Sequence, residues 1–287
     1  MTTEFSADHL RRIRRGFADI EDGQIHYRVC GAGAALPLVM LHGSPGSSFS
    51  LVPTMLHLGE KRRVIAPDHP GNGDSTPPAI KDPAIPDYAA AHVAALDGLG
   101  LQRFDLYGYH TGASVAVEIA LTHPGRVRRL ILDGPSLFTA EERDRLFRRD
   151  HAPAIPVSLD GQHLSAVWAM VRDAHVFWPW WNRGADGIRG RGLPSPDFLH
   201  GEVVEVLKAI GSYHLTYRSA LRFDKRSRLP HLALPVLVTA GPRDQNAKAL
   251  HPVAAMIRGA RAVEIPGLDD EAAVAASAAI FDDFLSA

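Results

Sequence analysis

The stretch DLYGYHTGASVAVEIA (105–120) indicates a strand, a tight turn and a helix, with His110 at the centre of the turn. Gly108 and Gly112 flank this residue, and glycine lets two backbone segments pass closely. A sharp turn of this kind lifts its central side chain above the edge of a sheet, where Ser, Asp or Cys is the expected nucleophile. An imidazole at this position could act as base, acid or nucleophile. We therefore treat His110 as the first candidate for chemistry.

Several short apolar segments predict buried strands that would carry this turn. Helices alternate with them at 87–100 and 111–122. Strands that alternate with helices imply a mostly parallel sheet with helices on both faces, so the predicted fold class is α/β. The predicted strands are 24–31, 37–43, 62–68, 104–108, 128–134, 235–241 and 260–267.

Between Phe138 and Pro230 the strand pattern stops, and amphipathic helical stretches surround a segment rich in Trp, Pro and Gly. All four Trp residues lie in this block. We expect a helical cap at 138–230, inserted between two parts of one core at 1–137 and 231–287.

Five motifs in this order resemble the α/β-hydrolase fold, in its epoxide hydrolase-, dehalogenase- and C–C hydrolase-like branch. VMLHGSPGSS is similar to an oxyanion-loop motif, VIAPDHPGNGDS to a D-x-x-G-x-G-x-S turn, and GYHTGA to the nucleophile turn. LVTAGPRD is similar to the strand that ends in the acid of the triad, and the helical block falls where that family places its cap. The resemblance implies an oxyanion hole formed by the backbone N–H groups of Ser44 and Thr111.

The same resemblance makes Asp244 the acid and places Asp270, in IPGLDDEAA, where the triad histidine is usual. A Ser–His–Asp relay is therefore absent. Because an imidazole reaches farther than a serine hydroxyl, we expect His110 to contact Asp270 or Asp244, with Asp133 as a reserve partner. Flanking carboxylates favour imidazolium, whereas the helix N-terminus favours the neutral ring. We expect a ring that is protonated or strongly hydrogen-bonded, and direct nucleophilic attack by His110 stays open.

Aromatic side chains of the helical block are the main candidates for substrate contacts, although helically spaced aromatics are more often core residues. His42, in the HG motif, is expected mainly to support the oxyanion loop. His42, His110, Asp244 and Asp270 could in principle converge on a metal, but their spacing has no H-x-x-x-H signature, and neither metal nor cofactor is expected. The predicted substrate-binding residues are His42, Trp168, Trp178, Trp181, Tyr213 and Tyr217.

Composition indicates a globular cytoplasmic protein: 287 residues are 46% hydrophobic and 22% charged, with a net charge of −1. This charge gives no field that favours nucleic acid or an acidic membrane. No apolar run reaches a membrane span, and the charged N-terminal stretch, expected to form a solvated helix, has no signal-peptide pattern. Cys30 is the single cysteine, so no intramolecular disulfide can form. The expected partner is a small-molecule substrate, and a monomer and a homodimer both stay open.

The leading prediction is a hydrolase that acts on a small, apolar, carbonyl-bearing compound through His110, Asp270 and Asp244. A second is a cofactor-independent lyase, isomerase or decarboxylase in which His110 transfers a proton. A third is a catalytically silent ligand-binding protein, because a fold alone does not decide among such functions.

Overall fold

An eight-stranded sheet forms the centre of the computed structural model, which describes residues 11–148 and 152–287. Continuous apolar runs build its inner strands, and every residue of β3, β4 and β7 is buried. The strands are β1 (Arg14–Ile20), β2 (Gly23–Cys30), β3 (Leu38–Leu41), β4 (Val64–Pro67), β5 (Phe104–Tyr109), β6 (Val127–Asp133), β7 (Val236–Ala240) and β8 (Arg261–Glu264).

The strand order is β1-β2-β4-β3-β5-β6-β7-β8. From β4 to β8 all neighbours are parallel, whereas β2 runs antiparallel to both β1 and β4. The predicted mostly parallel sheet is therefore confirmed. Parallel neighbours bring the carboxyl ends of β3, β5, β6 and β7 to one edge, where the segments that follow them meet.

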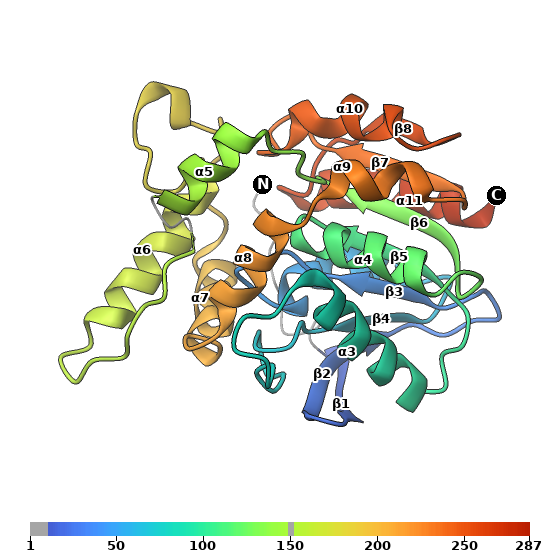
Figure 1. The fold of residues 1–287 in the computed structure, drawn as a ribbon, viewed down its shortest axis with the longest axis horizontal. Helices are drawn as coiled ribbons and strands as arrows, with labels where there is room; N and C mark the ends of the chain where they lie inside the picture. The colour runs from blue at the N-terminus through green and yellow to red at the C-terminus, as the bar shows by residue number, and fades with distance from the viewer. Residues whose placement is uncertain (1–10, 149–151) are drawn as a thin grey trace.

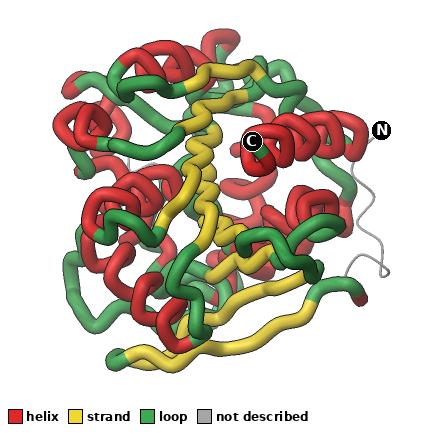
Figure 2. Tube along the Cα trace, turned by 90° about the vertical axis from the view of Figure 1, so that its right-hand side faces the viewer, coloured by secondary structure: helices red, strands yellow, loops and turns green. Residues whose placement is uncertain are grey.

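Helices cover both faces of the sheet, which is seen nearly edge-on in Figure 2. One apolar core lies between the sheet and α3, α4 and α10, and a second lies between the sheet and α2 and α11. The helices are α2 (Val52–Leu58), α3 (Ile85–Gly98), α4 (Thr111–Thr122), α5 (Ala140–Arg148), α6 (Gln162–Val176), α7 (Pro196–Lys208), α8 (Tyr213–Arg222), α9 (Lys225–Arg228), α10 (Leu250–Ala255) and α11 (Glu271–Ser286).

The segment between β6 and β7 contains α5 to α8 and lies beyond one end of the sheet, on the left in Figure 1. It has its own apolar core, formed largely by α6, α7 and α8. Helix formation is interrupted around Gly211, which separates α7 from α8. This break turns α8 back toward the sheet, where it contacts α3 and α4.

The described part of the N-terminal segment forms a strand and not the expected helix. Residues 1–10 of the expected solvated helix lie outside the described residues, and Arg14–Ile20 form strand β1 instead. This strand pairs with β2 in antiparallel register, from Arg14 opposite Val29 to Ile20 opposite Gly23. Among the described residues, no helix is long and apolar enough to cross a bilayer.

Gly112 should be the least replaceable glycine of the turn after β5. A Cβ at this position would overlap the carbonyl oxygen of Leu41 and lie 2.8 Å from that of His42, and neither backbone atom can move without displacing β3. We expect Gly112→Ala to lower the free energy of unfolding by about 3 kcal/mol, the upper range for overpacking. Urea denaturation measures this loss. Gly211→Ala, where a Cβ meets nothing within 4 Å, is the control and should change stability little.

Candidate functional site

His110 occupies the sharp bend between β5 and α4, with φ 48° and ψ −106°. It is the one non-glycine residue with positive φ in the described part of the chain. Such a conformation is costly for a side-chain-bearing residue, and residues held in it cluster at functional sites. Two contacts hold it: the backbone N–H of His110 donates to the carbonyl of Asp133 over 3.0 Å, and the ring stacks on Tyr109 with centroids 3.8 Å apart.

Asp244 is the carboxylate that His110 contacts. His110 Nε2 lies 2.7 Å from Asp244 Oδ2, and both side chains are largely buried. The other carboxylate oxygen, Oδ1, accepts the backbone N–H of Asn246 over 2.7 Å. The Asn246 side chain in turn donates to the carbonyl of Gly134 over 2.7 Å. These bonds fix the orientation of the carboxylate toward the imidazole.

Electrostatics keep Asp244 ionised. Burial, the largest effect, raises the pKa of its carboxyl, whereas the charge and the hydrogen bond of His110 lower this pKa. The Asn246 amide and the Arg189 guanidinium act in the same direction, so the net pKa of Asp244 lies below its usual range. An ionised carboxylate accepts the Nε2–H of the ring, which leaves Nδ1 as the nitrogen that can exchange a proton.

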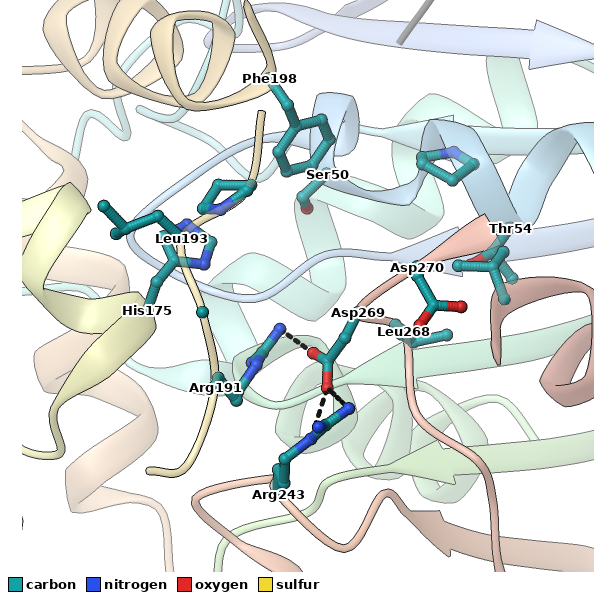
Figure 3. Close-up of a pocket in the computed structure, with 14 residues that line it drawn as sticks. Ser50, Thr54, His175, Arg191, Leu193, Phe198, Arg243, Leu268, Asp269 and Asp270 are labelled. Atoms are coloured by element: carbon teal, nitrogen blue, oxygen red, sulfur yellow. Dashed lines mark hydrogen bonds and ion pairs between the residues drawn. The ribbon is translucent and has the colours of Figure 1, made fainter. Parts of the chain in front are cut away.

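Asp270 does not share this arrangement. Its Oδ1 accepts the backbone N–H of Ala273 over 2.9 Å and caps α11. The neighbouring Asp269 forms ion pairs with Arg191 and Arg243, and Figure 3 shows both guanidinium groups directed at its carboxylate. Of the two partners expected for His110, the structure therefore brings Asp244 to the ring and places Asp270 at the start of α11: among the described residues, Asp244 is the ion-pair partner of His110.

Asp133, the reserve partner, is bound elsewhere. Its carboxylate accepts the hydroxyl of Tyr107 over 2.6 Å and that of Thr239 over 3.0 Å. Burial raises its pKa to about 6, although the Tyr107 hydrogen bond acts in the opposite direction. Asp133 therefore serves the bend through its backbone carbonyl, and its side chain anchors the strands beside it.

The loop after β3 lies against the bend. A Cβ on Gly43 would come within 3.4 Å of the His110 Cβ, which shows how close the two backbones are. Ser44 and Thr111 line one small recess of about 30 Å³ together with His110. Thr111 is the first residue of α4, so its N–H is among those without an intrahelical acceptor. The two expected oxyanion donors thus lie next to the imidazole.

A larger cavity of about 200 Å³ adjoins this recess and shares His110, Ser44, Trp178, Tyr217 and Gln245 with it. Its walls come from the loop after β3, the bend, and the segment between β6 and β7. Its remaining lining is Gly43, Pro45, Ser50, Leu51, Tyr109, Met170, Val171, Ala174, His175, Trp180, Arg189, Arg191, Phe198, Glu202 and Leu268.

The structure divides the expected substrate-contact residues. Trp178 and Tyr217 line the cavity. Tyr213 is fully buried in the core of the α5–α8 segment, and its hydroxyl donates to the carbonyl of Pro153. Trp168 is among the exposed large hydrophobic residues, and neither it nor Trp181 belongs to the lining of this cavity. Helical spacing of aromatic residues could not separate core from cavity.

Arg189 lines the cavity and was not predicted from the sequence. Its Nη1 donates to the carbonyl of Ala174 over 2.6 Å, whereas Nε is buried without a partner and no described carboxylate forms an ion pair with it. Burial and the nearby Arg191 charge both lower its pKa. A partly buried cation without a carboxylate partner is incompletely solvated, which has a cost in free energy. It leaves the cavity with a positive charge that an anionic ligand can neutralise.

His42 lies where the mainly expected supporting role places it, and it is not among the residues that line the cavity. It is fully buried; its Nδ1–H donates to the Gly43 carbonyl over 2.6 Å, and Nε2 accepts the backbone N–H of His69 over 2.9 Å. His69 Nε2 donates to the carbonyl of His42, and His69 Nδ1 lies 2.7 Å from His92 Nε2. A chain of three buried histidines thus joins the loop after β3 to α3.

Burial holds these histidines neutral. It lowers the pKa of His92 from 6.5 to about 3, with the His42 charge acting in the same direction, and the pKa of His69 falls well below 6.5. Below pH 6.5 the unfolded chain therefore binds more protons than the folded chain. The stability that is present above pH 6.5 is lost as the pH falls toward the pKa values of these histidines in the folded state. Each histidine that stays neutral in the folded state should lower the free energy of unfolding at pH 5 by about 2 kcal/mol.

The measurement is the free energy of unfolding at pH 7 and pH 5, by urea denaturation. We expect His92→Gln, whose amide can still donate to His69, to reduce the loss between the two pH values by about 2 kcal/mol. The exposed His251→Gln should leave that loss unchanged. Equal acid sensitivity of His92→Gln and the wild type would contradict the role of His92.

A group of His26, Asp68 and Asp74 is the described set close enough together to hold a metal ion. Its atoms already have partners: His26 Nδ1 lies 2.8 Å from Asp68 Oδ2, and Asp74 forms an ion pair with Lys208. Asp68 also accepts the backbone N–H groups of Ser48 and Asp74. These hydrogen bonds fix the turn after β4 through side-chain-to-backbone contacts.

The fold and the bend define the class of protein. Residues 37–154 match the family model described as the alpha/beta hydrolase fold. An esterase from Exiguobacterium antarcticum superposes with a TM-score of 0.71 over 96% of this chain and 100% of that chain, at 19% identity. The chain has the α/β-hydrolase fold.

Sequence relatives are more specific but match a shorter segment. The chain is 42% identical over 108 residues to the 2-hydroxymuconate semialdehyde hydrolase of Pseudomonas sp. (strain CF600), which covers 36% of this chain and 38% of that protein. It is 39% identical over 137 residues to a 2-hydroxy-6-oxononadienedioate/2-hydroxy-6-oxononatrienedioate hydrolase of Pseudomonas putida, covering 46% of each. The matches thus span less than half of these relatives' length.

Proposed function

We propose that this protein hydrolyses a small carbonyl-bearing compound that carries a negative charge, with His110 and Asp244 as its catalytic pair. The observation that supports this proposal most is the 2.7 Å contact between His110 Nε2 and Asp244 Oδ2 at the wall of a cavity. Residues 138–230 would act as the helical cap that closes this cavity.

In the proposed reaction, the Asp244 carboxylate holds the Nε2–H of the neutral ring, and Nδ1 takes a proton from a water molecule. The resulting hydroxide attacks the substrate carbonyl, and the N–H groups of Ser44 and Thr111 stabilise the developing oxyanion. The imidazolium then returns its proton to the leaving group. This sequence replaces the acyl-serine route with direct attack by water.

The charge of the substrate is proposed from Arg189. Its guanidinium lines the same cavity as His110 and lacks a described carboxylate partner, and guanidinium binds carboxylates in a two-point geometry. The names of the two Pseudomonas relatives include a semialdehyde and dioates, which are small oxo compounds. A carboxylate on the substrate would place its carbonyl between Arg189 and His110.

The test is a matched pair of esters with the same leaving group, 4-nitrophenyl butyrate and the anionic 4-nitrophenyl hemisuccinate, supplemented by lactones and epoxides. We expect turnover that falls at least about 100-fold in His110→Ala. Arg189→Met should raise KM for the hemisuccinate about 10-fold or more, while the butyrate is unaffected.

Other outcomes identify the alternative functions. Exchange of substrate C–H for deuterium without hydrolysis, lost in His110→Ala, would identify a proton-transfer enzyme such as an isomerase, lyase or decarboxylase. Binding of the hemisuccinate or lactones without turnover or exchange would identify a ligand-binding protein. Hydrolysis that His110→Ala leaves intact would contradict the proposed role of His110.

A further inference from the structure

We infer that Ser136 and Lys225 form a second nucleophile–base pair at the recess beside His110, which cleaves carboxylic esters through an acyl-serine more slowly than the reaction that depends on His110. The inference rests on the carbonyl chemistry proposed above and supplies a nucleophile that the bend itself lacks. Lys225 Nζ lies 2.9 Å from Ser136 Oγ, within the range of a nucleophile–base hydrogen bond. The two residues are far apart in sequence and meet because each flanks a connection between the core and the α5–α8 segment.

Ser136 faces the reactive recess. It lines the same recess as His110, Ser44 and Thr111, so its hydroxyl lies near the candidate oxyanion donors. It follows β6 by three residues, and the carbonyl of Gly134 just before it is held by the Asn246 side chain. A serine on a fixed segment at the carboxyl end of a parallel strand is well placed for attack on a bound carbonyl.

Lys225 has the surroundings of a basic amine. Only 6% of its surface is exposed, and no carboxylate of the described residues forms an ion pair with it. Burial lowers its pKa from 10.5 to about 7, and the charge of Arg143 on α5 acts in the same direction. A substantial fraction of the amine is therefore neutral near pH 7, and a neutral amine can accept the hydroxyl proton of Ser136.

The reaction needs only the ester and one water molecule. The Lys225 lone pair takes the Ser136 proton as Oγ bonds to the ester carbonyl carbon, whose π electrons move to the oxygen. When the carbonyl reforms, the bond to the leaving alkoxide breaks and the ammonium of Lys225 protonates that alkoxide. Water then attacks the acyl-serine and gives one proton to Lys225. As the bond between the acyl carbon and Ser136 Oγ breaks, the Lys225 ammonium returns that proton to Oγ, which releases the acid and restores free Ser136 and the neutral amine. Related serine–lysine pairs are established variants of the catalytic triad.

The test is covalent labelling of the full-length protein with a fluorophosphonate, located by intact mass and peptide mapping. We expect one adduct, on Ser136, formed at a rate that rises with pH through about 7. Lys225→Met should slow labelling at least about 100-fold and remove this pH dependence. The exposed Lys248→Met and the exposed Ser165→Ala are matched controls and should label as the wild type does.

Mapping on the wild type alone can overturn the inference, whatever happens to the stability of the variants. An adduct on another residue, or none on Ser136, contradicts the pair. Turnover that requires His110, with no residual Ser136-dependent turnover in His110→Ala, leaves the proposed function standing and rejects the acyl-serine. An adduct on Ser136 together with His110-independent turnover supports the pair and rejects His110 as the base.

Discussion

Replacing Asp244 by asparagine should lower kcat/KM for the ester that the protein turns over by about 100-fold or more, within the range seen when a triad acid is lost. The reason is the contact of 2.7 Å between Asp244 Oδ2 and His110 Nε2. An amide can present its NH₂ to Nε2, which forces the proton onto Nδ1 and removes the lone pair that must accept a proton. Steady-state kinetics at saturating and limiting substrate give the effect on kcat and on KM.

Asp270→Asn is the matched control, because asparagine still caps a helix N-terminus and α11 should keep its start. We expect its kcat/KM to stay within about threefold of the wild type, the scale of a distant screened charge. A loss in Asp270→Asn as large as that in Asp244→Asn would show that the triad-histidine position still serves the reaction. That result would restore the three-residue site that the sequence predicts.

The parts of the fold that the sequence predicts well are those where one physical signal dominates. Continuous apolar runs mark strands buried on both faces, and β3, β4 and β7 follow this pattern at every residue. The strand β1 was not predicted, because most of its residues are exposed and neither burial nor strict alternation marks it. A polar edge strand is held by backbone pairing, which leaves little trace in side-chain patterning.

The candidate site follows the same division. His110 and Asp244 could be located because each follows a predicted buried strand, and parallel strands bring such ends together. Asp270 could not be assigned, since one carboxylate can either cap a helix or pair with an imidazole, and only the backbone geometry decides. Arg189 lies in a stretch without periodicity, and Ser136 and Lys225 have no local motif. The positions of these three residues depend on the path that the chain takes between β6 and β7, and no local sequence pattern predicts this path.

A second large effect is expected where the α5–α8 segment meets the core. Glu205, on α7, is buried and accepts hydrogen bonds from Ser47 over 2.7 Å, from Lys208 over 2.9 Å and from the buried Arg28 over 3.3 Å. Arg28 also donates to Ser48 over 2.7 Å and lies 3.5 Å from Asp68. The carboxylate thus joins α7 to β2 and the loop after β3.

Glu205→Ala should lower the free energy of unfolding by about 3 kcal/mol, because it leaves Arg28 buried with one carboxylate fewer. Glu205→Gln retains an acceptor for Ser47, so its free energy of unfolding should fall by less than that of Glu205→Ala. The control is Arg222→Ala, which breaks an exposed ion pair with Asp82 and should cost less than about 1 kcal/mol. Urea denaturation followed by far-ultraviolet circular dichroism measures each value.

The location of the tryptophans makes this experiment informative about the cavity as well. All four lie between residues 168 and 181, so their fluorescence reports on the α5–α8 segment, whereas circular dichroism reports on the whole chain. If Glu205 mainly holds this segment on the core, the fluorescence transition of Glu205→Ala should move to lower urea than the circular dichroism transition. Such non-coincident transitions show that unfolding is no longer two-state. Coincident transitions shifted together would instead mean that Glu205 stabilises the core and the segment as a single cooperative unit.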